Sequence, residues 1–489
     1  MSPSSFLRPT LLLSLLVSAL LALGAEGAPP AAHRLFANGL EAFVVENHTV
    51  PLVTVCVVFR GGASAQEADT AGLFHLYEHM LFASNEKYPN QAAFTAALNS
   101  LGVTGWNGST GEEYINYYIT LPSDKLGDGV EFWSWAVRHP VFDPAKLEAE
   151  KGVVLAEIGG YHADPGQIYT NAFESRAFPA RPWRRNVDGP EAVVKAATVE
   201  KLAAMRDTWY VPGNAAVLIG GDVAPEAAFA AVERFFGDWK GRRPPPIGVP
   251  PQESLPAGVR LIYQDPGYYE GVADVRMAWR GPDLPRDLKD TYAADVLLFL
   301  TNSPVGKFKK ALMAKVPGLY APEYISLGYP TARDGGLFYF DTYMRIGDYP
   351  SLPDRAETLR AALLEELALV AKDPVAYFGE AELAKAKRKL VDDNLYSMEN
   401  PASFVTGTLV FWWAVASADY FFGYEANCAK VGFDDIASLI RRYFLGANSE
   451  VALRINAADA RGDPGVAKAL GSGGWEEITA ANAFWWMRK

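Results

Sequence analysis

The sequence predicts an α+β protein built from two homologous α/β-sandwich domains, each a largely antiparallel sheet packed with helices. The chain has 489 residues, which is too long for one compact core and suits two domains. A segment at 241–256 divides it, because its dense prolines favour an extended linker and exclude a helix or central strand. The same strand pattern is repeated on both sides of that linker.

The N-terminus has the order of a secretory signal peptide over residues 1–27. Arg8 is followed by an apolar run at 11–23 and then by small residues. The run is too short to span a bilayer comfortably, and no other stretch of the chain reaches transmembrane length. We therefore expect an exported protein, periplasmic or secreted, with no membrane span.

The net charge and the number of cysteines limit which partners and which redox compartment this protein can be expected to have. The net charge of −12 at pH 7 argues against nucleic acid or an anionic membrane surface as a partner. Cys56 and Cys428 are too few for a disulfide scaffold, although a bridge between them is left open. Cys56 lies in the strand-like run Leu52–Phe59 and is expected to be a small buried hydrophobe.

The repeat begins with two similar strand pairs. Gly39–Glu46 leads into an alternating strand that ends at Arg60, and Gly258–Asp265 leads into another that ends at Arg280. The distance from the glycine to the arginine differs by only one residue between the copies. Such self-similarity at long period indicates two domains of one fold.

Helices are expected between the strands of each copy. The two opening strands are each followed by an Asp-Thr pair that can cap a helix, at Asp69-Thr70 and Asp290-Thr291. Longer helical patterns follow, for example at Thr198–Tyr210 and Asp354–Ala371. Strands adjacent in sequence favour a largely antiparallel sheet over a doubly wound one.

The first copy contains the motif HxxEH at His75, Glu78 and His79. Histidines four apart lie on one helix face, so both imidazoles can reach one ion, and Glu78 can reach a water on that ion. A pair of helical histidines is more often a surface or satisfied core feature. Here the chain has only six histidines and the flanks are apolar, so a metal is the simplest explanation. The order is the reverse of the zinc motif HExxH.

In the second copy the three positions of this motif hold Val296, Phe299 and Leu300. The helix is retained there without groups that could bind a metal. We therefore expect the chemistry in one half only. The expected division is the signal peptide at 1–27, a catalytic domain at 28–240, the linker at 241–256 and a homologous non-catalytic domain at 257–489.

A catalytic zinc usually has three protein ligands and an open position for water. Glu150 and Glu157 are seven residues apart on one face of an expected helix. Apolar residues flank Glu157 on both sides, so we expect its carboxylate to be the more buried and to be the third ligand. Glu150 then suits a supporting role that orients a ligand. On helical spacing alone, two solvated glutamates remain an equal alternative.

The motif from His75 to His79, followed by Glu157 with Glu150 one heptad before it, resembles the pitrilysin family of zinc peptidases. That family includes insulin-degrading enzyme and the mitochondrial processing peptidase, and the resemblance runs from about Leu35 to the C-terminus. It implies one Zn²⁺ per chain, held by His75, His79 and Glu157. It also implies that Glu78 is the catalytic base and that the substrates are peptides.

The resemblance extends to a segment that receives the substrate as an added β-strand. The matching residues here are Asn107, Gly108, Ser109 and Thr110. Main-chain pairing of this kind grips an extended peptide with little regard to its sequence. Trp106–Gly108 also fits an ordinary turn, and that interpretation has equal weight.

The second half departs from the family pattern. Members that complete their own site carry an arginine followed seven residues later by a tyrosine, and both are thought to contact the substrate carbonyl. Tyr320 matches the tyrosine, but Met313 stands at the arginine position and cannot donate a hydrogen bond to an oxyanion.

The resemblance also implies that four such domains enclose a peptide chamber, so this chain forms half of a clamshell. The implied partner is a homologous two-domain subunit in a heterodimer, or a second copy of this chain. The expected function is an exported zinc metalloendopeptidase that cleaves peptides or unfolded segments inside a dimeric chamber. The alternative is a non-catalytic scaffold or assembly subunit, although such chains usually lose the zinc motif.

Overall fold

The structure is a computed structural model that describes residues 31–251, 253–347 and 349–488. The expected signal peptide lies outside these residues. Among the helices of the described residues, none has both the length and the apolar character needed to cross a membrane.

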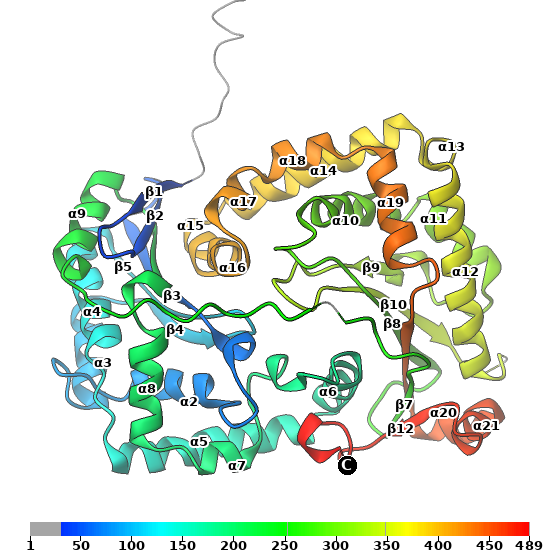
Figure 1. The fold of residues 1–489 in the computed structure, drawn as a ribbon, viewed down its shortest axis with the longest axis horizontal. Coiled ribbons are helices and arrows are strands. Elements are labelled where there is room, and N and C mark those ends of the chain that lie inside the picture. Colours follow the sequence, from blue (N-terminus) through cyan, green and yellow to red (C-terminus); the bar gives the residue numbers. More distant parts are fainter. Residues whose placement is uncertain (1–30, 252, 348, 489) are drawn as a thin grey trace, which may run out of the picture.

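The first half, residues 31–240, contains a six-stranded sheet with the order β1-β2-β6-β3-β5-β4 (Figure 1). Neighbouring strands are antiparallel except for β2 and β6, which are parallel. The strands are β1 Ala32–Leu35, β2 Glu41–Glu46, β3 Leu52–Arg60, β4 Gly105–Thr110, β5 Tyr114–Pro122 and β6 Ala215–Gly221. Strand β4 therefore forms one edge of the sheet.

The second half, which follows the linker, contains a sheet with the order β12-β7-β11-β8-β10-β9. Its strands are β7 Arg260–Asp265, β8 Val272–Arg280, β9 Ser326–Gly328, β10 Leu337–Arg345, β11 Ser449–Asn456 and β12 Glu476–Ile478. Five of them repeat the order and directions of β2-β6-β3-β5-β4, including one parallel pair between β7 and β11. The predicted fold class and the internal repeat are confirmed.

Helices occupy much of the first half, and all of them except α6 contribute to the core on its sheet. They are α2 Leu73–Leu81, α3 Gln91–Ser100, α4 Leu126–Arg138, α5 Pro144–Ala163, α6 Pro165–Ala177, α7 Glu191–Lys195, α8 Val199–Trp209 and α9 Pro225–Phe236. The helix predicted at Thr198–Tyr210 is confirmed by α8, where the Thr198 side chain accepts a hydrogen bond from the Lys201 N–H at the N-cap.

Helices of the second half follow a similar order, with α10, α12 and α14 in the places of α2, α4 and α5. They are α10 Leu288–Thr301, α11 Lys307–Lys315, α12 Leu352–Lys372, α13 Pro374–Phe378, α14 Glu380–Ser397, α15 Pro401–Ser403, α16 Leu409–Val415, α17 Ala418–Phe422, α18 Tyr424–Lys430, α19 Phe433–Tyr443, α20 Ala457–Gly462 and α21 Pro464–Gly471. The predicted helix at Asp354–Ala371 is confirmed within α12.

The capping role predicted for the two Asp-Thr pairs is wrong. Helix α2 begins at Leu73 after Gly72, and Thr70 Oγ1 instead accepts a hydrogen bond from the Glu67 N–H in the preceding turn. Helix α10 begins earlier, at Leu288, so that the second pair lies inside its first turn.

Each half covers the sheet of the other. In β3, Val57 and Phe59 face the helices of the first half, whereas Cys56 faces the segment 401–422 of the second half. In return, α6 of the first half packs on β7, β11 and β12 (Figure 1). Strand β3 is apolar at successive positions because both of its faces are covered.

Both cysteines are buried and free. Cys56 lies in the core between the first sheet and α16, and Cys428 lies in the main core of the second half. The bridge that the sequence left open is therefore not formed.

Replacing Trp413 with alanine is expected to lower the free energy of unfolding by about 3–5 kcal/mol, the usual cost of removing a buried tryptophan. Trp413 is 1% exposed in the core between α16 and the first sheet, and its indole Nε1 donates to Glu41 Oε1 at 2.9 Å. Urea denaturation measures the change. Leu395→Ala, at a position 66% exposed, is the control and should change stability by less than about 0.5 kcal/mol. Equal effects of the two substitutions would contradict the packing of α16 on the first sheet.

Candidate metal centre

Two glycines bring the segment at Asp188 against the start of α2. Both have positive φ, +91° at Gly72 and +68° at Gly189. A Cβ on Gly72 would lie 2.2 Å from the Asp188 carbonyl oxygen, and a Cβ on Gly189 would lie 2.1 Å from that of Ala71. Only glycines allow this approach, which places the Asp188 carboxylate beside α2.

His75, Glu78 and His79 lie on the face of α2 that turns away from the core, while Leu76, Tyr77 and Met80 are buried. The Nε2 atoms of His75 and His79 lie 3.6 and 3.4 Å from the same oxygen, Oε2 of Glu157 on α5. Two ligands of a tetrahedral zinc with bonds of about 2.1 Å are separated by about 3.4 Å. The donor set and spacing of His75, His79 and Glu157 therefore fit a zinc ion, and all three ligand atoms lie within 4.8 Å of one another.

A second carboxylate faces the other nitrogen of each imidazole. His79 Nδ1 lies 3.4 Å from Glu150 Oε2, and His75 Nδ1 lies 3.7 Å from Asp188 Oδ1. Carboxylates in this position orient metal-binding histidines and select the tautomer that leaves Nε2 free. Burial, together with the nearby His79, lowers the pKa of His75 to about 4, so its ring is neutral at neutral pH. Burial and the charge of Glu157 raise the pKa of Asp188 to about 6.

Glu78 is held between α2 and the edge strand β4. Thr110 Oγ1 donates a hydrogen bond to Glu78 Oε2 at 2.6 Å. Burial raises the pKa of Glu78, and the hydrogen bond from Thr110 opposes that rise. The other oxygen, Oε1, faces Gly108, where an added Cβ would lie 3.0 Å away. One carboxylate oxygen is thus occupied by the protein.

The segment Asn107–Thr110 lies in β4 and not in a turn, so the turn interpretation is wrong. Strand β4 pairs only with β5, which leaves one row of its main-chain groups unpaired by the sheet. A cavity of about 580 Å³ connects this strand with the metal-binding residues. Its lining consists of His75, Glu78, His79, Phe82, Ala83, Gln91, Trp106, Asn107, Gly108, Glu150, Glu157 and Tyr161.

The expected burial of Glu157 is wrong. Its side chain is 39% exposed, more than that of Glu150 at 22%. The apolar residues beside Glu157 do not enclose it, because Val153 and Ala156 of α5 are themselves exposed. Glu157 instead faces the open cavity, where a ligand that shares its metal with water is expected to lie.

Tyr320 is not among the residues that line this cavity. It follows α11 in the second half, its main-chain N–H donates to Tyr343 O, and its ring contacts Tyr324 at 5.3 Å. Met313 lies in α11 and packs against the core of the second half.

Six residues of the site were missed by sequence reasoning: Phe82, Ala83, Gln91, Trp106, Tyr161 and Asp188. Tyr161 could have been found, because it lies four residues after Glu157 and therefore on the same face of α5. For Asp188 the only signal was the glycine that follows it.

Comparison with known proteins agrees with this geometry. The family model described as Insulinase (Peptidase family M16) matches residues 42–191, which include every metal-facing residue. A second model, described as Peptidase M16 inactive domain, matches residues 196–390, and the two cover more than half of the chain. The chain belongs to peptidase family M16. The M16 family is one of zinc metallopeptidases, which confirms the resemblance inferred from the motif.

M16 relatives of known name include zinc proteases. The probable zinc protease PqqL of Haemophilus influenzae is 28% identical over 203 residues, 40% of this chain and 22% of that protein. Mitochondrial-processing peptidase subunit beta of Caenorhabditis elegans is 21% identical over 362 residues, 72% of this chain and 74% of that protein. The match spans less than half the length of PqqL and 49% of an uncharacterized zinc protease of Rickettsia felis.

Solved M16 structures share the fold. The periplasmic protease PqqL from Escherichia coli superposes with a TM-score of 0.72 at 16% identity, over 91% of this chain and 50% of that one. A protease from Helicobacter pylori superposes with a TM-score of 0.70 at 18% identity, over 87% of this chain and 100% of that one.

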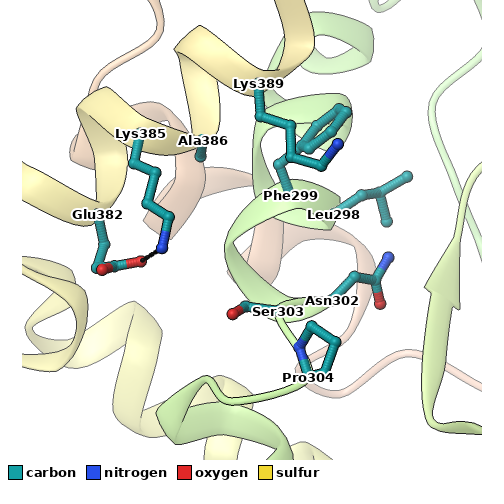
Figure 2. A pocket seen from close by; sticks show the side chains of 9 residues that line it. All are labelled: Leu298, Phe299, Asn302, Ser303, Pro304, Glu382, Lys385, Ala386 and Lys389. Atoms are coloured by element: carbon teal, nitrogen blue, oxygen red, sulfur yellow. Dashed lines mark ion pairs between the residues drawn. The ribbon is translucent and has the colours of Figure 1, made fainter. Parts of the chain in front are cut away.

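The second half has a different cavity between α10 and α14, the helices that take the places of α2 and α5 (Figure 2). Phe299, which takes the place of Glu78 in the register predicted from the sequence, lines it, and α14 contributes Glu382, Lys385 and Lys389. Asn302 donates to Leu327 O at 2.7 Å and accepts from Leu327 N at 2.9 Å, so its amide covers the edge strand β9. Among the described residues, the second half holds no cluster of metal-binding side chains, and a side chain covers part of its sheet edge.

Replacing Gly108 with alanine is expected to lower peptide cleavage by about 10²-fold, the usual cost of a misplacement near 1 Å at a reacting group. The added Cβ would lie 2.9 Å from the Phe82 ring and 3.0 Å from Glu78 Oε1, so the ring, the carboxylate or β4 must shift. Steady-state cleavage rates measure the loss. The control is Gly105→Ala in the same strand, where no atom lies within 4 Å of an added Cβ. If both variants were fully active, the close packing of β4 on Glu78 would have no role in catalysis.

Proposed function

We propose that this protein is an exported zinc metalloendopeptidase that cleaves peptides or unfolded segments. The observation that carries the proposal is the convergence of His75 Nε2 and His79 Nε2 on Glu157 Oε2, with Glu78 on the same helix face. Membership of family M16 and the names of its relatives support it.

In this proposal one zinc ion per chain is held by His75, His79 and Glu157. When bound, zinc lowers the pKa of a water molecule towards about 7 and polarises the scissile carbonyl. Glu78 accepts the proton of the attacking water at Oε1, because Thr110 occupies Oε2, and then delivers it to the leaving amine. Glu150 and Asp188 hold the two imidazoles in orientation.

The substrate is proposed to bind as an added strand on β4, along Asn107, Gly108, Ser109 and Thr110. Thr110 then has two tasks, since it also fixes Glu78. A peptide in this position would pass directly beside the Glu78 carboxylate, because Gly108 lies against Oε1.

A second subunit is proposed to complete the chamber. No residue of the second half lines the cavity among the described residues, and Met313 packs against the core of that half. Contacts to the substrate carbonyl, including a tyrosine in the role expected for Tyr320, would come from a homologous two-domain subunit or a second copy of this chain.

In this arrangement residues 28–240 are the catalytic domain, 241–256 the linker and 257–489 the non-catalytic domain. A signal peptide at 1–27 would direct the chain to the periplasm and would then be removed. The Escherichia coli relative PqqL is named a periplasmic protease.

The alternative function is a non-catalytic scaffold or assembly subunit of the same family. One observation favours it, namely that Tyr320 is not among the residues that line the cavity at the metal centre.

The first experiment combines metal analysis with cleavage of an unstructured fluorogenic peptide. We expect one zinc per chain, cleavage that is lost with 1,10-phenanthroline, and recovery when zinc is returned. The same assay is repeated with a co-expressed homologous subunit, and light scattering gives the assembly state. Stoichiometric zinc with no cleavage in either assay would favour the scaffold.

A further inference from the structure

A cavity of about 1060 Å³ lies between the linker and the junction of the two halves, and we call it the linker cavity. It is separate from the metal centre and shares no lining residue with the metal-site cavity. Its lining contains four arginines and no acidic side chain, in a chain whose net charge is −12. The arginines are Arg60, Arg242, Arg243 and Arg333.

Arg60 and Arg333 come from opposite halves and are anchored at the same place. Arg60 Nη2 donates to Trp413 O at 3.0 Å, with its guanidinium 3.8 Å from the Trp413 ring centroid. Arg333 donates to the neighbouring carbonyl of Ala414. The two guanidiniums are therefore fixed at the end of α16 before any ligand arrives.

The charges at this anchor are only partly compensated. Glu41 lies 3.7 Å from Arg60, and Glu113 lies 3.5 Å from Arg333, but neither acid lines the cavity. Burial lowers the pKa of Arg60 to about 10, and although Glu41 opposes this, the charge of Arg333 lowers the pKa further. An anion between the two guanidiniums would relieve their repulsion.

Arg242 and Arg243 supply charge from the linker side. Both are exposed, and within the described residues neither has a hydrogen-bond or ion-pair partner. Other arginines that meet the linker are already used, since Arg184 donates to Gly248 O and Arg286 to Pro250 O. Arg242 and Arg243 directly precede three prolines, at 244–246, which keep this part of the linker extended. The two free arginines therefore stay beside the cavity.

We propose that the linker cavity binds a small multivalent oxyanion of the phosphate class, such as pyrophosphate or the phosphate chain of a nucleotide. Guanidinium groups bind phosphate oxygens in bidentate geometry, and a single carboxylate could not engage arginines on several walls at once. The bound anion joins the linker to both halves, so it also stabilises their arrangement. This inference does not depend on the proposed peptidase activity.

Isothermal titration of the purified full chain with pyrophosphate tests the proposal. The double variant Arg242→Gln/Arg243→Gln should bind at least about tenfold more weakly, because it loses two charge-assisted contacts. Neither side chain has a partner to lose, so the variant should retain the melting temperature of the free protein. The matched control, Arg388→Gln/Arg461→Gln, removes the same charge from exposed positions and should bind as the wild type does.

Further arms separate the possible sources of the phosphate. Tighter binding of ATP than of tripolyphosphate would identify a nucleotide, and equal binding would identify an inorganic polyphosphate. A rise in melting temperature with pyrophosphate that is absent from the double variant would add support. The proposal is overturned if millimolar pyrophosphate does not bind, if the double variant binds unchanged, or if citrate binds as tightly as pyrophosphate.

Discussion

Replacing Glu78 with glutamine is expected to lower kcat/KM for peptide cleavage by about 10²- to 10⁴-fold while the protein keeps its zinc. Glutamine preserves the shape of the side chain and can still accept the hydrogen bond from Thr110, but it cannot take a proton from water. Glu78 is not one of the three converging ligand residues, so the metal content should not change.

The measurement pairs initial cleavage rates with zinc content on the same preparation. Glu67→Gln is the control, because Glu67 is an exposed glutamate outside the lining of the site. Full activity of the Glu78→Gln variant would show that Glu78 is not the catalytic base. Loss of zinc together with activity would instead show that Glu78 supports the metal.

Replacing Glu157 and Glu150 in turn should give two different losses of metal. Glu157 Oε2 lies within 3.6 Å of both Nε2 atoms, so Glu157→Gln removes a charged ligand and is expected to abolish stoichiometric zinc. Glu150 reaches only Nδ1 of His79, so Glu150→Gln is expected to weaken zinc binding by about 10- to 100-fold.

Competition with a zinc-sensitive chelator measures these affinities. Glu148→Gln serves as the control, because Glu148 lies on the same helix, is 71% exposed and pairs only with Lys151. Equal affinities of the Glu157 and Glu150 variants would contradict the assignment of separate roles to the two carboxylates.

The repeat in the sequence was sufficient to predict the fold class, because the same spacing of strands recurs in both sheets. It did not predict that segment 401–422 covers the first sheet or that α6 covers the second. An apolar helix face shows that something is covered, but its pattern does not say which sheet lies opposite. That choice depends on contacts between residues far apart in the sequence.

The metal-facing residues were predictable where helical spacing set their geometry. His75, Glu78 and His79 follow from one helix face, and Glu157 follows from the need for a third ligand. The exposure of Glu157 was mispredicted because residues adjacent in sequence lie on different faces of a helix. Apolar neighbours therefore do not show that Glu157 itself faces the core. Asp188 depends on a close approach of two loops, which no local pattern records.

The reciprocal covering of the two sheets makes the whole chain the unit of folding. A cut within 241–256 would leave the first sheet without α16 and the second without α6, exposing apolar surface on both fragments. The fragments should therefore aggregate when expressed alone and should recover only when produced together. The halves repeat one strand order, but each relies on a segment of the other to cover its sheet.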